Sequence, residues 1–236
     1  MIKNNSIKFK ELVWDSKKLN KKVYSIEFKK NLKENEMYDL LNSCKKGLYY
    51  FKNPTNLRKN SNKIALKTNA TLYDTNILFQ SKKIKSKFDS NKNFKYAENK
   101  YINLNYDKLN FKFSRFYKDN KLKDEMRSVY KEWISNSINK KNKSFLVCKN
   151  DDKEVAFLLY KLIKNDYIIE LLFVRKEYQK LGIGTNLLEL LREKAIKNKI
   201  NNIYVGTQIS NIRAINFYIK NGFIVKKTTD IYHWWK

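Results

Sequence analysis

Cysteine and histidine are scarce in this chain of 236 residues, which has two cysteines and one histidine. Cys44 and Cys148 do not suggest a disulfide framework, so a reducing compartment fits the sequence. Cys148 lies in an apolar run and is expected to be buried. The single histidine, His233, has no partner ligands at a suitable spacing. The sequence therefore predicts no metal site.

Long apolar runs are also missing. No window approaches the ~20 apolar residues that a membrane-spanning helix needs, and residues 1–5 lack the apolar stretch of a signal peptide. We expect a soluble, cytoplasmic protein without a membrane span. Apolar residues still make up 42% of the chain, with 14 Phe, 16 Tyr and 4 Trp, which is enough for a packed core. The length allows one large domain or two small ones.

Acidic residues and arginine are both few. The chain has 23 Asp and Glu against 51 Lys and Arg, a formal net charge of +28, yet only six of the 51 are Arg. Arginine is favoured for forked contacts to phosphate, and the lysines are spread along the whole chain. A general lysine bias therefore explains the charge better than a polyanion-binding face, and we expect no nucleic-acid partner. The excess charge would still attract an anionic nucleotide substrate.

The first part of the chain gives weak signals for secondary structure. Residues 7–28 have two strand-like ends around a polar centre, residues 34–44 have the spacing of a short helix, and residues 71–80 indicate a strand. Residues 81–100 are rich in Lys, Asn and Ser, which is typical of a surface loop or linker. No internal repeat of short period is visible.

The second part gives clearer signals. Turn residues separate short apolar runs, and the pair Asn221-Gly222 is a typical helix end. The predicted order is helix, three antiparallel strands, helix, strand, helix and one or two strands, over residues 119–137, 144–149, 155–163, 167–174, 184–198, 202–207, 211–220 and 223–235.

The most informative segment runs from Val174 to Thr185, where an apolar strand ends, a basic loop carries Gly182 and Gly184, and a long helix begins. Backbone N–H groups at a helix N-terminus are unpaired and lie at the positive end of the helix dipole. Glycine lets a pyrophosphate approach the main chain closely. Alone, the fragment is equally well explained as a glycine turn between a strand and a helix.

A second segment strengthens this interpretation. Residues 179–184 (QKLGIG) resemble the Q/R-x-x-G-x-G/A motif of the GNAT N-acetyltransferases, and residues 211–223 (NIRAINFYIKNGF) resemble the family motif N-x-x-A-x-x-F/L-Y-x-x-x-G-F. The resemblance implies an α/β (α+β) protein with the GNAT fold, a mixed and mostly antiparallel sheet flanked by helices. It places the catalytic domain at residues 106–236, after a smaller N-terminal α/β domain at residues 1–105.

The resemblance also implies a site for acetyl-CoA as cosubstrate, where the sheet splays near Val174. The strand would pair with the pantetheine amides, the loop and helix start would hold the pyrophosphate, and the second helix would touch the CoA arm. The residues expected to bind acetyl-CoA are Phe173, Val174, Gln179, Lys180, Leu181, Gly182, Ile183, Gly184, Thr185, Asn211 and Ala214.

Two residues are candidates for proton transfer. The resemblance makes Tyr218 the acid that protonates the departing thiolate, which suits a phenol of pKa ~10 against a thiol of ~8.5. Glu170 would accept the amine proton directly or through a water, because alternation puts it on one strand face with Leu172 and Val174. The alternatives are a packing role for Tyr218 and a surface position for Glu170.

Further segments bear on the acceptor. Residues 12–23, 72–79, 130–137 and 232–235 resemble segments of the TDP-fucosamine acetyltransferase family, although Leu19-Asn20 replaces its usual Phe-Gly and residues 45–70 match nothing. This resemblance implies an amino-sugar nucleotide, dTDP-4-amino-4,6-dideoxy-galactose, as acceptor. Its pocket between the domains would be lined by Trp14, Asp15, Tyr130 and His233.

Other interpretations remain open. One is a GNAT enzyme that acetylates a protein N-terminus, a lysine or a polyamine. Another is a non-enzymatic nucleic-acid binder, whose affinity would fall steeply with salt. His233 could also be a hydrogen-bonded structural residue, and Trp133 fits a core position. A homodimer is compatible with the sequence.

Overall fold

The computed structural model describes residues 5–81, 94–103, 114–122, 124–126 and 128–236. In this part of the chain one sheet joins ten strands in the order β1-β2-β3-β10-β4-β9-β8-β7-β6-β5. The strands are β1 (Ile7–Glu11), β2 (Val23–Phe28), β3 (Leu48–Pro54), β4 (Thr71–Ser81), β5 (Lys95–Asn99), β6 (Lys143–Asn150), β7 (Lys153–Ile163), β8 (Asp166–Val174), β9 (Asn202–Gln208) and β10 (Ile224–Trp235). The helices are α1 (Val13–Lys18), α2 (Glu34–Ser43), α3 (Arg58–Lys67), α4 (Arg115–Lys118), α5 (Val129–Ser135), α6 (Ile183–Lys197) and α7 (Ile212–Lys220).

The pattern of parallel and antiparallel pairing is the same on both sides of the central antiparallel pair, β10 and β4. On one side β10 pairs antiparallel with β3, β3 parallel with β2, and β2 antiparallel with β1. On the other side β4 pairs antiparallel with β9, β9 parallel with β8, and β8 antiparallel with β7. Helices α2 and α6 connect the two parallel pairs, and α3 and α7 lead into β4 and β10.

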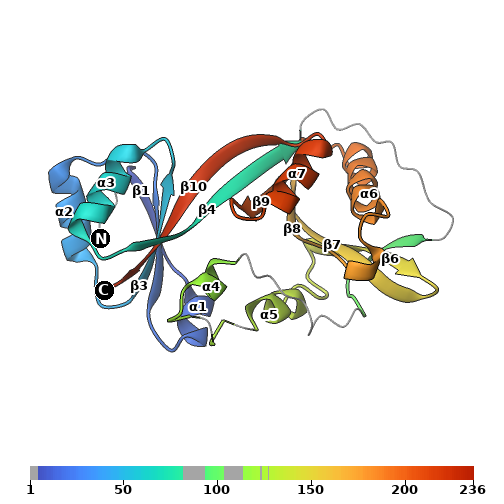
Figure 1. Cartoon of the computed structure of the whole chain (residues 1–236), viewed down its shortest axis with the longest axis horizontal. Coiled ribbons are helices and arrows are strands. Elements are labelled where there is room, and N and C mark those ends of the chain that lie inside the picture. Colours follow the sequence, from blue (N-terminus) through green and yellow to red (C-terminus); the bar gives the residue numbers. More distant parts are fainter. Residues whose placement is uncertain (1–4, 82–93, 104–113, 123, 127) are drawn as a thin grey trace.

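The described chain thus contains two units with the same order of strands and the same two connecting helices, and the first unit has α1 in addition, between β1 and β2. We call residues 7–81 the first unit and residues 153–235 the second unit. Each unit places its last strand beside the other: β4 lies between β9 and β10, and β10 lies between β3 and β4. Figure 1 shows these two long strands crossing the middle of the molecule side by side.

The expected mixed sheet with flanking helices is confirmed. The three antiparallel strands of the second part are β6, β7 and β8, and the predicted apolar face of α6 is buried against them through Leu187, Leu188, Leu191 and Ala195. A separate core lies under α2 and α3. The expected domain boundary at residues 105 and 106 stays a prediction, and the sheet continues across it because β4 pairs with β9.

Some predicted elements are wrong. The sequence predicts one helix over residues 119–137, but α5 covers only Val129–Ser135. At the start of this segment Asp119 forms a local turn, in which its side chain accepts a hydrogen bond from the backbone N–H of Lys121 at 3.0 Å. Strand β5 lies in the expected loop of residues 81–100, whose residues 82–93 are outside the described ranges. Strand β3 and helix α3 were not predicted. Among the described residues, no helix has the length and apolar character to cross a membrane.

Candidate active site

The N-terminus of α6 is open. Its N-cap is Gly182, whose φ of 78° is a left-handed conformation that glycine adopts without strain. No side chain caps this helix, and its first turn has no acidic residue. The first N–H groups of a helix have no partner within it. They are therefore available here to an anionic ligand, and the expected binding of a pyrophosphate stays a prediction.

The second glycine of the loop has a packing role. A Cβ at Gly184 would lie 3.2 Å from the ring of Phe217 in α7. At Gly182, by contrast, a Cβ would meet nothing within 4 Å. Glycine is therefore required at the two positions for different reasons: Gly182 permits the left-handed turn, and Gly184 permits α6 to pack closely on α7.

Gln179 fastens the loop to the end of β8. Its Nε2 donates a hydrogen bond to the carbonyl oxygen of Val174 at 2.8 Å. A pantetheine amide that approached this carbonyl would share the acceptor with Gln179. Lys180 has a positive φ of 68° and, like Leu181, is exposed on the loop. The expected ligand contacts of these residues stay predictions.

Strands β8 and β9 separate where the site is expected. Their parallel pairing runs only from Asp166 with Asn202 to Ile169 with Val205. A register irregularity in the pairing with β7 follows at once, with Glu170 as the extra residue between Ile169 and Leu171. The predicted splay is confirmed, and it begins four residues before Val174. Phe173 and Val174 line the part of β8 that has left β9, and both are half-buried.

Glu170 is held by cations rather than placed on the surface. Its side chain is 4% exposed and lies 2.6 Å from the ammonium groups of both Lys143 and Lys161. Trp133, which is half-exposed rather than in the core, donates its indole N–H to the same carboxylate at 3.3 Å. Burial alone would raise the pKa of Glu170, but the hydrogen bonds from the two lysines hold it below its ordinary value. The lowered pKa makes Glu170 a weaker base. Its role as proton acceptor stays a prediction, and the two lysine ammonium groups disfavour that role.

Helix α7 presents its predicted face to the core. Asn211 is its N-cap, and the Oδ1 atom accepts a hydrogen bond from the backbone N–H of Ala214 at 3.2 Å. Ala214 and Ile215 are half-buried, and Tyr218 is the one buried residue of this helix. The amide group of Asn211 keeps its N–H donors for other contacts. Asn211, Ala214 and Tyr218 therefore share one side of α7, as their spacing predicts.

Tyr218 lies among aromatic rings. Its ring centroid is 5.8 Å from that of Phe79, 5.3 Å from Phe217 and 5.6 Å from Phe223. Burial raises the pKa of its phenol above the ordinary value. The group therefore keeps its proton at neutral pH, which a proton donor requires. A purely packing tyrosine would have the same surroundings, so the role of Tyr218 stays a prediction.

A second group of polar residues lies on the central strands. Tyr50 of β3 pairs with His233 of β10, and Asp74 of β4 pairs with Ile231 of β10. Side chains at such paired and alternating positions share one face of a sheet. The guanidinium of Arg115, at the start of α4, lies 4.5 Å from the ring centroid of Tyr50. We call Tyr50, Asp74, Arg115, Asp119 and His233 the central polar cluster.

Of the four expected acceptor residues, His233 belongs to this cluster and two others adjoin it. Asp15 of α1, Tyr130 of α5 and His233 all lie close enough to Arg115 for its charge to affect their pKa values. Trp14 is different: it is 38% exposed, and its ring contacts the ammonium group of Lys18. Figure 1 shows α1, α4 and α5 on the same side of the central strands.

Sequence reasoning missed most of the cluster. Tyr50 lies in a segment without a recognisable motif, Arg115 lies before the helix predicted over residues 119–137, and Asp119 lies at the start of that predicted helix. Asp74 was noticed only within a strand motif. These residues are brought together by strand pairing, which cannot be read from the sequence. In the described residues, no group of three or more His, Cys, Asp or Glu is arranged to hold a metal ion.

The chain belongs to the acetyltransferase (GNAT) family, whose profile matches residues 106–223, half of the chain. It is similar to the spore coat polysaccharide biosynthesis protein SpsD of Bacillus subtilis, with 28% identity over 126 residues that cover 53% of this chain and 44% of SpsD. The chain spans less than half the length of the relatives that it matches.

Solved structures show the same fold. A GCN5-related N-acetyltransferase from Sphaerobacter thermophilus aligns with a TM-score of 0.62 and 8% identity, over 97% of this chain and 76% of that one. A conserved protein of unknown function from Staphylococcus epidermidis aligns with a TM-score of 0.64 and 14% identity, over 100% of this chain and 93% of that one. At these identities the likeness concerns the fold alone.

Proposed function

We propose that this protein transfers an acetyl group from acetyl-CoA to the amino group of a nucleotide-linked amino sugar. The observation that carries the proposal is the uncapped N-terminus of α6 beside the splayed strands β8 and β9. The splay would admit the pantetheine arm, and the helix N-terminus would bind the pyrophosphate. The high net positive charge would help to attract both nucleotide substrates.

The chemistry is direct transfer. The amine attacks the thioester carbonyl, and backbone N–H groups of β8 beyond the splay stabilise the oxyanion. The C–S bond then breaks, and Tyr218 gives its proton to the departing thiolate. The nitrogen loses a proton to solvent or to Glu170. The products are an N-acetyl amide and CoA, with no covalent enzyme intermediate and no metal required.

The acceptor is inferred from two observations. SpsD, by its name, serves polysaccharide biosynthesis, and a polysaccharide pathway needs activated sugars. The central polar cluster also adjoins the loop that leads to Asn211, because Ile209 donates its backbone N–H to Thr75 of β4 at 2.8 Å. Lys118 of α4 contacts Ser210 of the same loop at 3.1 Å. An acceptor on the cluster would therefore reach toward the CoA arm. A cytoplasmic location and a homodimer stay predictions.

The test is thiol release from acetyl-CoA with a panel of amines: a dTDP-4-amino-4,6-dideoxy-hexose, a UDP-amino sugar, spermine and a lysine peptide. We expect turnover confined to the amino-sugar nucleotides. Turnover only with the peptide or with spermine would contradict the proposed acceptor and leave the acetyl-CoA site in place. No thiol release with any amine would contradict the proposed activity as a whole.

A further inference from the structure

Asp119 and His233 form a buried pair within the central polar cluster. The Oδ2 atom of Asp119 lies 2.7 Å from Nδ1 of His233, and both side chains are fully buried. The same oxygen accepts a hydrogen bond from the indole of Trp235 at 3.3 Å, and Oδ1 accepts one from the backbone N–H of Lys121. Burial would raise the pKa of Asp119, but these hydrogen bonds hold it below its ordinary value. Asp119 is therefore ionised at neutral pH.

This pairing determines where the imidazole carries its proton. A carboxylate can only accept hydrogen bonds, so Nδ1 of His233 must be the donor. Burial, aided by the charge of Arg115, lowers the pKa of His233 to about 4, so the ring is neutral at pH 7. A neutral ring with its proton on Nδ1 has a lone pair on Nε2. The rings of Tyr50 and Tyr73, with centroids at 4.7 and 4.6 Å, hold the imidazole in place.

The Nε2 atom has no hydrogen-bond partner although it is buried. Six buried side-chain atoms in the described residues lack a partner, and four of them belong to the central polar cluster: Tyr50 Oη, Asp74 Oδ1, Arg115 Nε and His233 Nε2. An unpaired buried polar group is costly, so such groups normally have a partner in the working protein. Three of these atoms belong to the strands β3, β4 and β10 and the fourth belongs to α4, and their gathering in one cluster indicates that a ligand or ordered water supplies the missing partners.

Arg115 adds a charge to this set. No ion pair joins it to a carboxylate of the described residues. Burial raises the pKa values of Asp15 and Asp74, and the charge of Arg115 opposes this rise at both carboxyl groups. Its guanidinium stacks on the rings of Tyr50 and Phe116, at 4.5 and 4.3 Å from their centroids. A stacked guanidinium whose Nε donor has no partner is well suited to a phosphate or another anionic group.

We propose that Asp119 fixes His233 in the tautomer with Nδ1–H, so that Nε2 accepts a hydrogen bond from an O–H or N–H group of the acceptor, while Arg115 binds an anionic group of the same molecule. The inference rests on the proposed function and restricts the class of acceptor molecule. The molecule must carry both a hydrogen-bond donor and an anion, as a nucleotide-linked sugar does and a polyamine does not. His233 and Arg115 are binding residues, and Asp119 is a positioning residue.

Nuclear magnetic resonance tests the tautomer directly, because the chain has a single histidine. In the free protein at pH 7, the ¹⁵N signals should show a protonated Nδ1 and an unprotonated Nε2. Saturation with dTDP-4-amino-4,6-dideoxy-galactose, without acetyl-CoA, should shift the Nε2 signal. A proton on Nε2 in the free protein, or an Nε2 signal unmoved by this sugar nucleotide, would overturn the proposal.

A matched pair of variants separates positioning from packing. In Asp119→Asn the carboxamide N–H can donate to Nδ1, which moves the ring proton to Nε2 and removes the acceptor. We expect KM for the amino-sugar nucleotide to rise about tenfold or more, with kcat and KM for acetyl-CoA nearly unchanged. Trp235→Phe removes the other side-chain donor to the same carboxylate oxygen and leaves the tautomer intact, so its KM should stay near that of the wild type.

The outcomes distinguish the two proposals. If the wild type acetylates the amino-sugar nucleotide and Asp119→Asn does not change KM, this inference is wrong and the proposed function stands. An equal rise of KM in both variants would indicate packing alone, and would also overturn it. If the wild type acetylates only peptides or polyamines, the proposed acceptor is wrong, and the narrower claim is wrong with it.

Discussion

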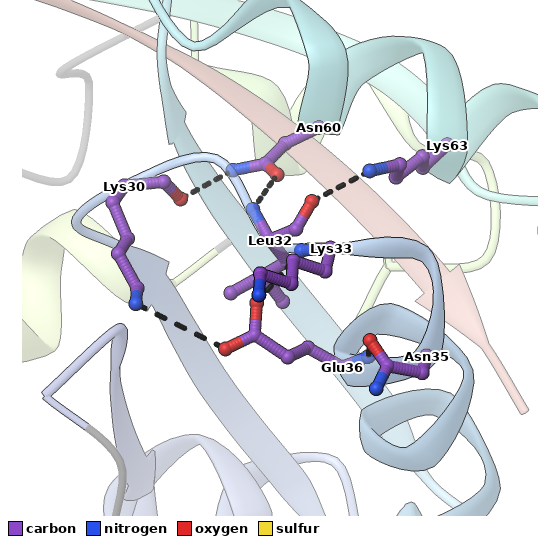
Figure 2. A network of polar contacts seen from close by, with 7 residues as sticks. All are labelled: Lys30, Leu32, Lys33, Asn35, Glu36, Asn60 and Lys63. Carbon is purple, nitrogen blue, oxygen red and sulfur yellow. Dashed lines mark hydrogen bonds and ion pairs between the residues drawn. The ribbon is translucent and has the colours of Figure 1, made fainter.

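The two units of the sheet start their first long helices in opposite ways. In the first unit, the backbone N–H of Lys33 before α2 donates to the carboxylate of Glu36 at 2.7 Å. The N–H of Leu32 donates to the side chain of Asn60 at 2.9 Å. Figure 2 shows these contacts beside the N-terminus of α2, where the side chain of Asn35 also accepts a hydrogen bond from the first-turn N–H of Glu36 at 2.9 Å. In the second unit, α6 begins at Gly182 with no side-chain cap and no acidic residue in its first turn.

The parallel strand pairs differ in the same sense. In the first unit β2 and β3 pair over five positions, from Val23 with Leu48 to Glu27 with Lys52. In the second unit β8 leaves β9 after Ile169, because Glu170 is inserted there. One order of elements thus gives a closed scaffold in one unit and an opening in the other. A few residues at the helix start and at the bulge make the difference.

The second helices differ as well. Asn211 caps α7, and Tyr218 follows seven positions later. The corresponding positions of α3 hold Leu57, which makes no side-chain cap, and Ile64, which is fully buried. Neither could bind an amide or donate a proton. We therefore expect one acetyl-CoA site in each chain, in the second unit.

The largest effect should come from making α7 resemble α3. Tyr218→Phe keeps the ring packing and removes the proton donor, so we expect kcat to fall about 100-fold while the Kd of acetyl-CoA stays nearly unchanged. Steady-state kinetics and calorimetric titration measure the two quantities. An unaltered kcat would exclude Tyr218 from the chemistry.

The next effect should come from closing α6 as α2 is closed. Thr185 stands three residues after the N-cap Gly182, the position that Glu36 has after Lys33. Thr185→Glu would place a carboxylate where the pyrophosphate is expected, and should weaken acetyl-CoA binding about tenfold or more. Thr185→Gln is the uncharged control and should bind more tightly than Thr185→Glu. Equal Kd values for the two variants would mean that no anion binds at this helix end.

A smaller effect should follow from crowding the contact between α6 and α7. Gly184→Ala forces the ring of Phe217 to move, and we expect the free energy of unfolding to fall by about 1 kcal/mol or more, with weaker acetyl-CoA binding. Gly206→Ala is the matched control, because its Cβ would make only ordinary contacts, at 3.6 Å from Asn76. Denaturant titration compares the two variants. Equal losses of stability would contradict the packing role of Gly184.

The smallest effect should come from opening α2. Glu36→Ala removes the partner of the Lys33 N–H, and we expect a loss of about 0.5–1 kcal/mol in the free energy of unfolding. Acetyl-CoA affinity should not change, because α2 lies in the unit without the splay. A second acetyl-CoA site in this variant would mean that the cap alone separates the two units.

The sequence predicted the parts of the site that are local. The segments 179–184 and 211–223 each contain a complete turn or helix start, so their residues stay together in any fold that preserves them. The central polar cluster is different, because Tyr50, Asp119 and His233 meet only through pairing of β3 with β10 and the turn at Asp119. The sequence also predicts that Glu170 shares one strand face with Leu172 and Val174. That prediction assumes strict alternation, which does not continue through the bulge at Glu170. The placement of β4 beside β9 and of β10 beside β3 could not be predicted either, because strand order is not visible in the periodicity of the sequence.

Calorimetric titration of the wild-type chain with acetyl-CoA measures whether the N-terminus of α6 is the one acetyl-CoA site. We expect one site for each chain, with an affinity that Thr185→Glu weakens and Glu36→Ala does not. Two sites for each chain would contradict the contrast between the units. An affinity equally insensitive to both substitutions would mean that acetyl-CoA does not bind at the N-terminus of α6.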